Sequence, residues 1–137
     1  MYFISTSVEE TYKIAHNFTQ SLQGTEVICL SGEIGAGKTH FIKGMAAYYG
    51  IPTQEIISPT FVLRRDYCST KGGLFHFDLY RLDEITDEVL ETIGLLDVIK
   101  EGIVLVEWGE RAKEKIAFDR IIRMQYMDEK TRSIVVQ

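Results

Sequence analysis

The sequence contains only two cysteines, Cys29 and Cys68, and neither lies in a Cys-x-x-Cys pair or near a Cys/His cluster. This scarcity argues against both a disulfide framework and a structural zinc site. Cys29 stands inside an apolar run, so we expect it to be a small core residue. Cys68 stands among polar residues and is expected to be an inert loop thiol.

Long apolar runs and an excess of basic residues are also missing. No segment approaches the roughly 20 apolar residues that cross a membrane, and the first residues lack the pattern of a secretory signal. We therefore expect a cytoplasmic protein without membrane contact. The net charge is −5, from 15 Lys and Arg against 20 Asp and Glu. Because phosphate contacts dominate nucleic-acid affinity, we expect nucleic acid to be handled through a partner.

What the chain does contain is ordinary for one globular domain. It has 137 residues, of which 45% are hydrophobic and 11% aromatic, and it shows no repeats or disordered composition. This length supports a single core, so residues 1–137 are predicted to form one domain.

The most informative segment is an octapeptide that fits the phosphate-binding pattern G-x-x-x-x-G-K-[ST]. A β-rich apolar stretch, residues 27–30, precedes it, and a helical pattern follows to about Tyr49. This order of strand, loop and helix is the context that the pattern requires. The residues expected to bind phosphate are Gly32, Glu33, Ile34, Gly35, Ala36, Gly37, Lys38 and Thr39, with His40 directly after them.

These residue types suit a polyphosphate for direct physical reasons. Glycines leave backbone N–H groups unobstructed and reach positive φ, so several amides can converge on one anion. The loop also leads into a helix N-terminus, where free N–H groups and the helix dipole favour negative charge. Lys38 adds a mobile full charge for the β and γ phosphates, and the Thr39 hydroxyl can ligate Mg²⁺. A plain glycine-rich turn with a solvated lysine is the alternative.

The remaining pattern predicts an α/β fold of the P-loop type, with helices on both faces of a mostly parallel sheet and an antiparallel hairpin portion. Ser7 and Glu10 have the spacing of a capping box, and Thr86 is placed to cap another helix. Gly24 is expected to end the first helix, and Lys71-Gly72-Gly73 to turn between two strands. The expected helices start at Ser7, after the glycine loop and at Thr86. The expected strands cover residues 27–30, 74–80, 102–106, 121–126 and 132–136, and residues 58–63 are expected to be a loop that leads into a further strand.

Two acids are predicted to serve the site. Glu107 follows four aliphatic residues about seventy positions after the glycine loop, which is the Walker B arrangement with glutamate in place of the usual aspartate. An ordinary carboxylate at a strand end is its alternative. Asp78 lies among aromatics in an expected strand, and it is either paired with a residue such as Arg81 or reserved for Mg²⁺ or water. His76, on the same face, is more simply a structural histidine.

Other residues leave their alternatives open. Ser58-Pro59-Thr60 is either a plain turn or a hydroxyl-bearing loop that senses phosphate. Trp108 is a core aromatic, a lid near the nucleotide or a partner anchor. Each of three arginines, Arg81, Arg111 and Arg132, has the charge to stabilise a transition state, although surface ion pairs are their commoner fate.

Four ordered motifs together resemble the bacterial TsaE (YjeE) family. They are residues 32–39, Ser58 to Phe61, His76 to Leu82 and Val106 to Arg111. The resemblance implies a small P-loop ATPase that uses ATP and Mg²⁺ in making N6-threonylcarbamoyladenosine in tRNA. It also implies TsaD and TsaB as partner proteins, with tRNA reached only through their complex.

The resemblance also assigns roles to residues. Lys38 and the loop backbone hold phosphates, Thr39 and Glu107 hold Mg²⁺, and Asp78 is the family's functionally important acid. Thr60 matches a position in the family's switch-like loop, and Trp108 matches the tryptophan beside the acid Glu107. The chain departs mildly from the family pattern, with Glu33 where Asp is usual and His40 where a second Thr is common. Family members contact adenine partly through the N-terminal segment, where Ser5, Thr6 and Thr11 are candidates.

We therefore expect in-line attack of water on the γ-phosphate, with Lys38 and Mg²⁺ neutralising charge and Asp78 or Glu107 orienting the water. Turnover is expected to be slow without a partner. A small-molecule or nucleoside kinase is one alternative, although no Arg-rich lid is evident. A non-hydrolysing nucleotide-dependent adaptor is another. A GTPase is disfavoured because the chain has no Asn-Lys-x-Asp pattern.

Overall fold

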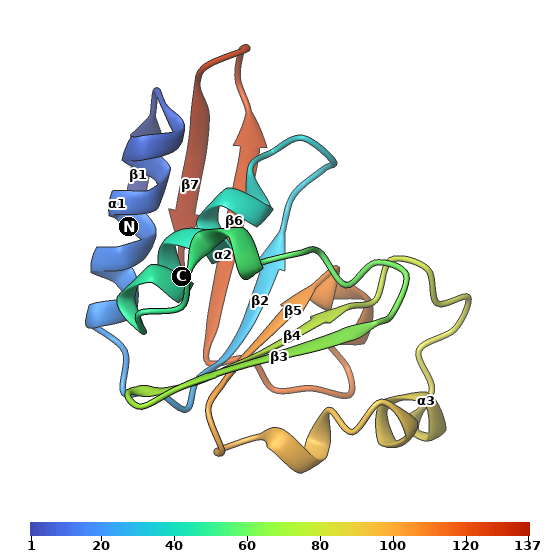
Figure 1. Ribbon diagram of the computed structural model, residues 1–137. Coiled ribbons are helices and arrows are strands. Elements are labelled where there is room, and N and C mark those ends of the chain that lie inside the picture. The colour runs from blue at the N-terminus through green and yellow to red at the C-terminus, as the bar shows by residue number, and fades with distance from the viewer.

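The computed structural model describes residues 1–137 and has one seven-stranded sheet, in the order β1-β7-β6-β2-β5-β4-β3 (Figure 1). The strands are β1 (Tyr2–Ser5), β2 (Val27–Ser31), β3 (Arg64–Ser69), β4 (Gly72–Asp78), β5 (Ile103–Glu107), β6 (Arg120–Tyr126) and β7 (Arg132–Val136). The α-helices are α1 (Val8–Gln20), α2 (Lys38–Tyr48) and α3 (Asp87–Thr92), and the short 3-10 helices are η1 (Thr53–Glu55), η2 (Leu96–Val98) and η3 (Gly109–Ala112).

The centre of the sheet is parallel and both margins are antiparallel. Strands β6, β2, β5 and β4 run parallel, whereas β3 pairs antiparallel with β4, and β7 pairs antiparallel with both β6 and β1. The predicted P-loop type of α/β fold is thus confirmed. The predicted antiparallel portion forms both edges of the sheet.

Strand β5 shows how the two faces of the sheet are covered. Its five residues are all buried, and the four apolar ones alternate between two apolar clusters. Ile103 and Leu105 join the cluster on the side of α1 and α2, whereas Val104 and Val106 join the cluster on the side of α3. A strand buried on both faces reads as continuous apolar sequence, as this one does.

Local signals explain where the helices begin. The Ser7 side chain accepts a hydrogen bond of 3.0 Å from the Glu10 amide, which confirms the predicted cap of α1. The reciprocal half of the capping box differs, because the Glu10 carboxylate accepts from the amide and hydroxyl of Thr6. Thr86 caps α3 as predicted, accepting a hydrogen bond of 3.1 Å from the Val89 amide.

Several predicted boundaries were wrong by a few residues. Helix α1 ends at Gln20 with Ser21 as its C-cap, so Gly24 lies beyond its end. Gly72 and Gly73 belong to β4, because pairing with β3 continues through them. Cys68 is exposed as expected but lies in β3 and not in a loop. None of the three α-helices has the length and apolar character required to span a bilayer.

Candidate functional site

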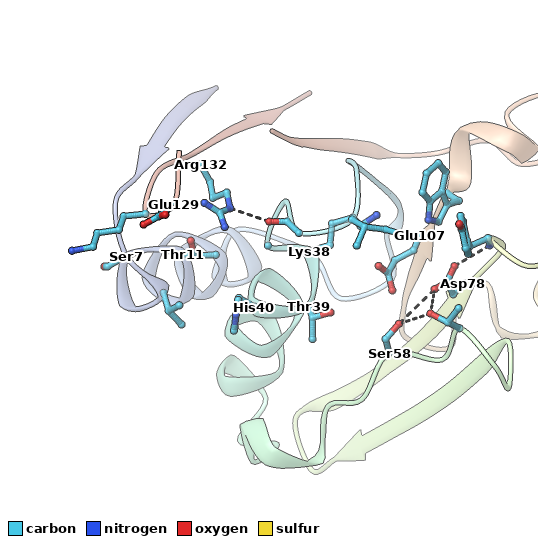
Figure 2. A pocket seen from close by; sticks show the side chains of 18 of the residues that line it. Ser7, Thr11, Lys38, Thr39, His40, Ser58, Asp78, Glu107, Glu129 and Arg132 are labelled. Atoms are coloured by element: carbon cyan, nitrogen blue, oxygen red, sulfur yellow. Dashed lines mark hydrogen bonds between the residues drawn. The ribbon is translucent and has the colours of Figure 1, made fainter. Parts of the chain in front are cut away.

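A cavity of about 920 Å³ opens at the carboxyl ends of β2, β4 and β5, where ligands bind in parallel α/β sheets (Figure 2). Its size falls in the range of small-molecule sites, roughly 300–1,000 Å³. The glycine loop, the start of α2, the loop before β3, the N-terminus of α1 and the β6–β7 turn all contribute to its walls. The lining residues include Thr11, Ile34, Gly35, Gly37, Lys38, Thr39, His40, Ser58, Thr60, Asp78, Glu107, Trp108, Glu129, Lys130 and Arg132.

Two glycines of the loop are required by its geometry. Gly32 has φ +149°, and a Cβ there would lie 2.5 Å from the carbonyl oxygen of Met124. Gly37 is the N-cap of α2 in the left-handed region, with φ +97° and no side-chain cap. The first amides of α2 have no acceptor within the helix and border the cavity. The loop thus presents amides to the cavity, which is an anion-binding arrangement.

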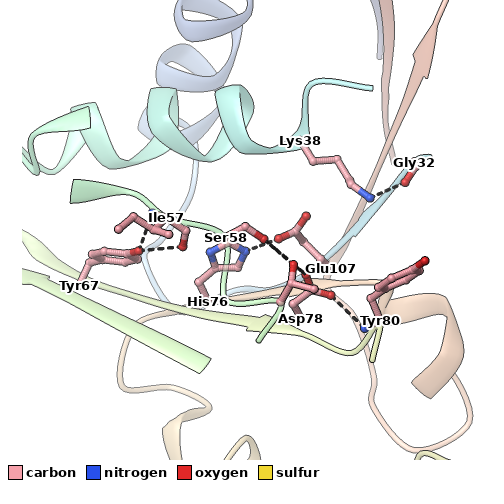
Figure 3. Close-up of polar contacts among 10 residues, drawn as sticks. Gly32, Lys38, Ile57, Ser58, Tyr67, His76, Asp78, Tyr80 and Glu107 are labelled. Atoms are coloured by element: carbon pink, nitrogen blue, oxygen red, sulfur yellow. Dashed lines mark hydrogen bonds and ion pairs between the residues drawn. The ribbon is translucent and has the colours of Figure 1, made fainter. Parts of the chain in front are cut away.

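Lys38 is held inside the site, where its side chain is only 8% exposed. Its ammonium group donates to the carbonyl oxygen of Gly32 and lies 4.8 Å from the ring centre of Trp108 (Figure 3). Neither contact is to a carboxylate. The full positive charge of Lys38 is therefore available to an anion in the loop.

Asp78 connects the end of β4 to the loop before β3. Its Oδ2 accepts hydrogen bonds from Thr60 Oγ1 at 2.8 Å and from Ser58 Oγ at 3.5 Å, and its Oδ1 accepts from the Tyr80 amide at 2.9 Å. Asp78 is 3% exposed and forms no ion pair with Arg81. The hydroxyls of the Ser58–Thr60 loop thus satisfy a buried carboxylate at the cavity wall.

Glu107 and His76 form a buried pair under the same wall. Parallel pairing sets Asp78 beside Glu107 and places His76 one step back on the same face. His76 Nε2 lies 2.6 Å from Glu107 Oε2, and the two residues are 0% and 4% exposed (Figure 3). No lysine or arginine pairs with Glu107. The pairing was missed in the sequence, because it depends on the register between β4 and β5.

Trp108 is half-buried and lines the cavity beside Glu107. Its backbone lies in the left-handed region at φ 60°, and its ring packs against Tyr80 with 5.1 Å between ring centres. Trp108 is thus not fully buried in the core, and it forms part of the cavity wall.

The three arginines are placed differently. Arg111 donates to the carbonyl oxygens of Leu79, Tyr80 and Asp83, so it braces the segment after β4. Arg81 lies over the ring of Phe61, 4.6 Å from its centre. Arg132 lines the cavity but donates to the carbonyl oxygens of Gly35, Asp128 and Thr131.

The far end of the cavity lies between α1, α2 and the β6–β7 turn (Figure 2). Thr6 and Thr11 line it, whereas Ser5 is buried and its hydroxyl bonds to Thr11 at 2.7 Å. Burial, reinforced by Lys43 and Arg132, lowers the pKa of His40. Glu129 and Lys130 also border this end and were not anticipated, because they lie in what reads as a solvent-exposed turn.

A family model described as Threonylcarbamoyl adenosine biosynthesis protein TsaE matches residues 5–134. The chain belongs to the TsaE family. A TsaE protein of Aquifex aeolicus is 42% identical over 132 residues, which cover 96% of this chain and 91% of that protein. A TsaE protein of Rickettsia felis is 33% identical over 130 residues, covering 94% and 75%. Both relatives are named tRNA threonylcarbamoyladenosine biosynthesis proteins.

A solved structure supports the same assignment. The crystal structure of YdiB from Bacillus subtilis superimposes with a TM-score of 0.75 at 27% identity, covering 98% of this chain and 82% of that one. The TsaE resemblance drawn from four motifs is therefore confirmed, and so is the fold class. The family match also extends over α1, β6 and β7, which lie outside those motifs.

Proposed function

We propose that this TsaE-family chain binds ATP with Mg²⁺ and hydrolyses it in support of threonylcarbamoyladenosine formation on tRNA. The observation that carries the proposal is convergence on one cavity. Five features meet at the carboxyl ends of three strands: the amide-presenting glycine loop, Lys38, the Thr39 hydroxyl, and the two buried acids Asp78 and Glu107. This set matches the parts that phosphoryl transfer requires.

The loop backbone and Lys38 bind the phosphates. Backbone amides of the loop and of the first turn of α2 surround the anion, and the Lys38 ammonium leaves the Gly32 carbonyl to meet the phosphate oxygens. As negative charge develops on the transferred group, the same donors stabilise it without reorganising. Trp108 and His40 also line the cavity and complete its walls.

Thr39 and Glu107 are the residues that would hold Mg²⁺, and the structure fits that role. Glu107 is a buried carboxylate that contacts His76 but no lysine or arginine, and such a charge is costly unless a cation compensates it. No cluster of three acidic, histidine or cysteine ligands exists. Mg²⁺ bound with nucleotide needs only one or two protein ligands besides phosphate and water. When bound, the ion neutralises charge on the β and γ phosphates.

Asp78 and Thr60 are proposed to order the attacking water. Asp78 accepts from the Thr60 hydroxyl at the cavity wall, so both groups keep oxygen lone pairs that can accept a hydrogen bond from a water beyond the γ-phosphate. Glu107 remains the alternative for this role. Both acids lie at strand ends, which hold them more rigidly than a loop would.

Turnover in the isolated chain is proposed to be slow because its three candidate arginines already make other contacts. Arg111 and Arg132 are engaged with backbone carbonyls, and Arg81 lies over Phe61. A partner is therefore proposed to complete the site or reposition one of these side chains. Exposed apolar side chains near the phosphate end, Ile34, Phe61 and Val62, support docking of a protein there.

The partners are proposed to be TsaD and TsaB, with tRNA engaged only through that complex. The net charge of −5 agrees with this division, because an acidic chain is a poor direct ligand for a polyanion. The chain is proposed to act in the cytoplasm.

A phosphate-release assay tests the proposal. ATP and Mg²⁺ are supplied to the chain alone and then with TsaD, TsaB and tRNA, using wild type and Lys38→Ala. The proposal expects slow release alone, faster release in the complex and none from Lys38→Ala. Modification of tRNA without any phosphate release would instead favour the adaptor role, and phosphate transfer to a small molecule would favour a kinase.

A further inference from the structure

The His76–Glu107 pair leaves one polar atom unexplained. His76 sits inside β4 with 0% exposure, and its only hydrogen bond joins Nε2 to Glu107 Oε2 at 2.6 Å. Its other ring nitrogen, Nδ1, is buried without a partner. A buried polar atom that stays unsatisfied costs free energy. What the imidazole provides is its hydrogen bond to Glu107, which a smaller or apolar side chain would not make.

The hydrogen-bond pattern determines which nitrogen carries the proton. A carboxylate only accepts hydrogen bonds, so Nε2 must be the donor to Glu107. If Nδ1 also carried a proton, a buried N–H would lack an acceptor. The arrangement thus assigns an N–H to Nε2, which donates to the carboxylate. One oxygen of Glu107 is then fixed by His76.

The second carboxylate oxygen is left for the cavity. Glu107 lines the cavity together with Thr39, and no protein hydrogen bond occupies Glu107 Oε1. Figure 3 shows the imidazole and carboxylate side by side beneath α2. The parallel register fixes their backbones, with His76 beside Leu105 and Asp78 beside Glu107, so the contact runs diagonally across one face of two buried strands.

We propose that His76 is a positioning residue for the divalent cation that accompanies the nucleotide, an inference that rests on the proposed function. By donating from Nε2 to one oxygen of Glu107, His76 fixes the carboxylate rotamer and leaves the other oxygen for the cation. Hydrogen-bond partners of metal ligands orient those ligands, and their loss typically weakens metal affinity about 10- to 100-fold. His76 itself touches neither the nucleotide nor the cation.

Two amide substitutions separate this role from simple packing. In His76→Gln the side-chain amide lies where Nε2 was, and in His76→Asn it lies nearer Nδ1 and falls short of Glu107. Mn²⁺ is titrated into each ADP-saturated variant, with binding followed by electron paramagnetic resonance. We expect His76→Gln to stay within about threefold of wild type and His76→Asn to bind Mn²⁺ about 10- to 100-fold more weakly. Equal affinities in all three proteins, or equal losses in both variants, would overturn the proposal.

The same substitution in Glu107→Gln protein tests whether a folding defect explains the loss of Mn²⁺ affinity. In Glu107→Gln protein, adding His76→Asn is expected to change Mn²⁺ affinity no further, because the oriented carboxylate is already gone. A further loss there would show that His76 acts through packing alone. If His76→Asn does not fold, the imidazole proton on Nε2 is sought by ¹⁵N resonance in wild type, and an Nε2 without a proton would contradict the mechanism.

ADP binding in the presence of a chelator separates this inference from the proposed function. All variants are expected to bind ADP equally without a divalent cation. Wild type that binds no ADP at all would refute the nucleotide site itself. Wild type that binds ADP and Mn²⁺ with no difference between His76→Gln and His76→Asn would refute only the role of His76.

Discussion

The Thr60 hydroxyl donates a hydrogen bond of 2.8 Å to Asp78 Oδ2, across eighteen residues of sequence. This contact joins the loop before β3 to the end of a buried strand. Phe61 and Val62, the next residues of the loop, are 81% and 55% exposed. The charge-assisted hydrogen bond from Thr60 is shorter than the 3.5 Å contact from Ser58, so it is the stronger side-chain anchor of this loop on Asp78.

Thr60→Val should release this anchor while keeping the side-chain shape. We expect faster amide hydrogen exchange in residues 58–62 and a loss of about 1.5–3 kcal/mol in the free energy of unfolding, because the hydrogen bond reaches a charged acceptor. The matched control is Ser58→Ala, whose hydroxyl is 3.5 Å from Asp78 and should matter less. Equal exchange rates in Thr60→Val and wild type would show that the loop is held by other contacts.

Lys38→Ala should abolish the optical signal of nucleotide binding. Trp108 is the only tryptophan, and the Lys38 ammonium lies 4.8 Å from its ring centre. We expect Mg²⁺–ATP to change Trp108 emission in wild type by drawing the ammonium away. Loss of a charged contact of about 1.5–3 kcal/mol weakens binding roughly tenfold or more. Lys43→Ala, on the same helix outside the cavity, is the control, and an unchanged titration of Lys38→Ala would remove Lys38 from the phosphate site.

Glu107→Ala should raise the magnesium requirement of hydrolysis. Removing the buried carboxylate deletes a proposed ligand, so we expect the Mg²⁺ concentration at half-maximal phosphate release to rise at least about tenfold, with a lower maximal rate. Magnesium titrations at fixed ATP measure both values. If the two titration curves coincide, Glu107 does not belong to the cation site.

Gly44→Ala should destabilise the protein although alanine is the better helix former. A Cβ at position 44 would lie 2.7 Å from Ala15 Cβ and 2.7 Å from the Tyr12 carbonyl oxygen, where α2 crosses α1. Overpacking of this kind costs about 1–3 kcal/mol, which exceeds the roughly 1 kcal/mol gain in helix propensity. Urea unfolding measures the difference. Lys13→Ala, on the exposed side of α1, should change stability by no more than about 0.5 kcal/mol.

The two cysteines should differ sharply in reactivity. Burial, with a smaller effect of Glu110, raises the pKa of the Cys29 thiol to about 11, whereas Cys68 is exposed. Because the thiolate is the nucleophile, Cys29 is expected to remain unmodified at pH 8 until the protein unfolds. In Cys68→Ser protein a thiol reagent should therefore report no reactive group under native conditions. Rapid modification of that variant would mean that β2 opens readily.

Most elements of the fold could be predicted from local chemistry. The apolar run at 103–106 identified a strand buried on both faces, and Ser7 and Thr86 identified two helix starts. The predicted strand boundaries were wrong where strand pairing overrode the turn preference of a residue. Gly72 and Gly73, for example, continue the hydrogen-bonded ladder with β3. Their partners, Ser69 and Cys68, come just before the turn, so the hairpin is tighter than the glycines alone suggest.

The residues of the site were named from motifs, but their mutual contacts were not. The Walker-type loop and the acids at strand ends carry residue-type signals. Both acids line the cavity, as do most residues of the loop, whereas Gly32, Glu33 and Ala36 do not. The His76–Glu107 contact depends on the register of β4 and β5, and Glu129 and Lys130 reach the cavity only because the β6–β7 turn lies beside α1. Such relationships arise from tertiary packing and leave no mark in local spacing.

Isothermal calorimetry of ATP with Mg²⁺ tests directly whether the cavity binds a nucleotide. We expect saturable binding of one nucleotide per chain to wild type, and a loss of affinity of about tenfold or more in Lys38→Ala. Absence of binding to wild type, with or without TsaD and TsaB, would contradict it.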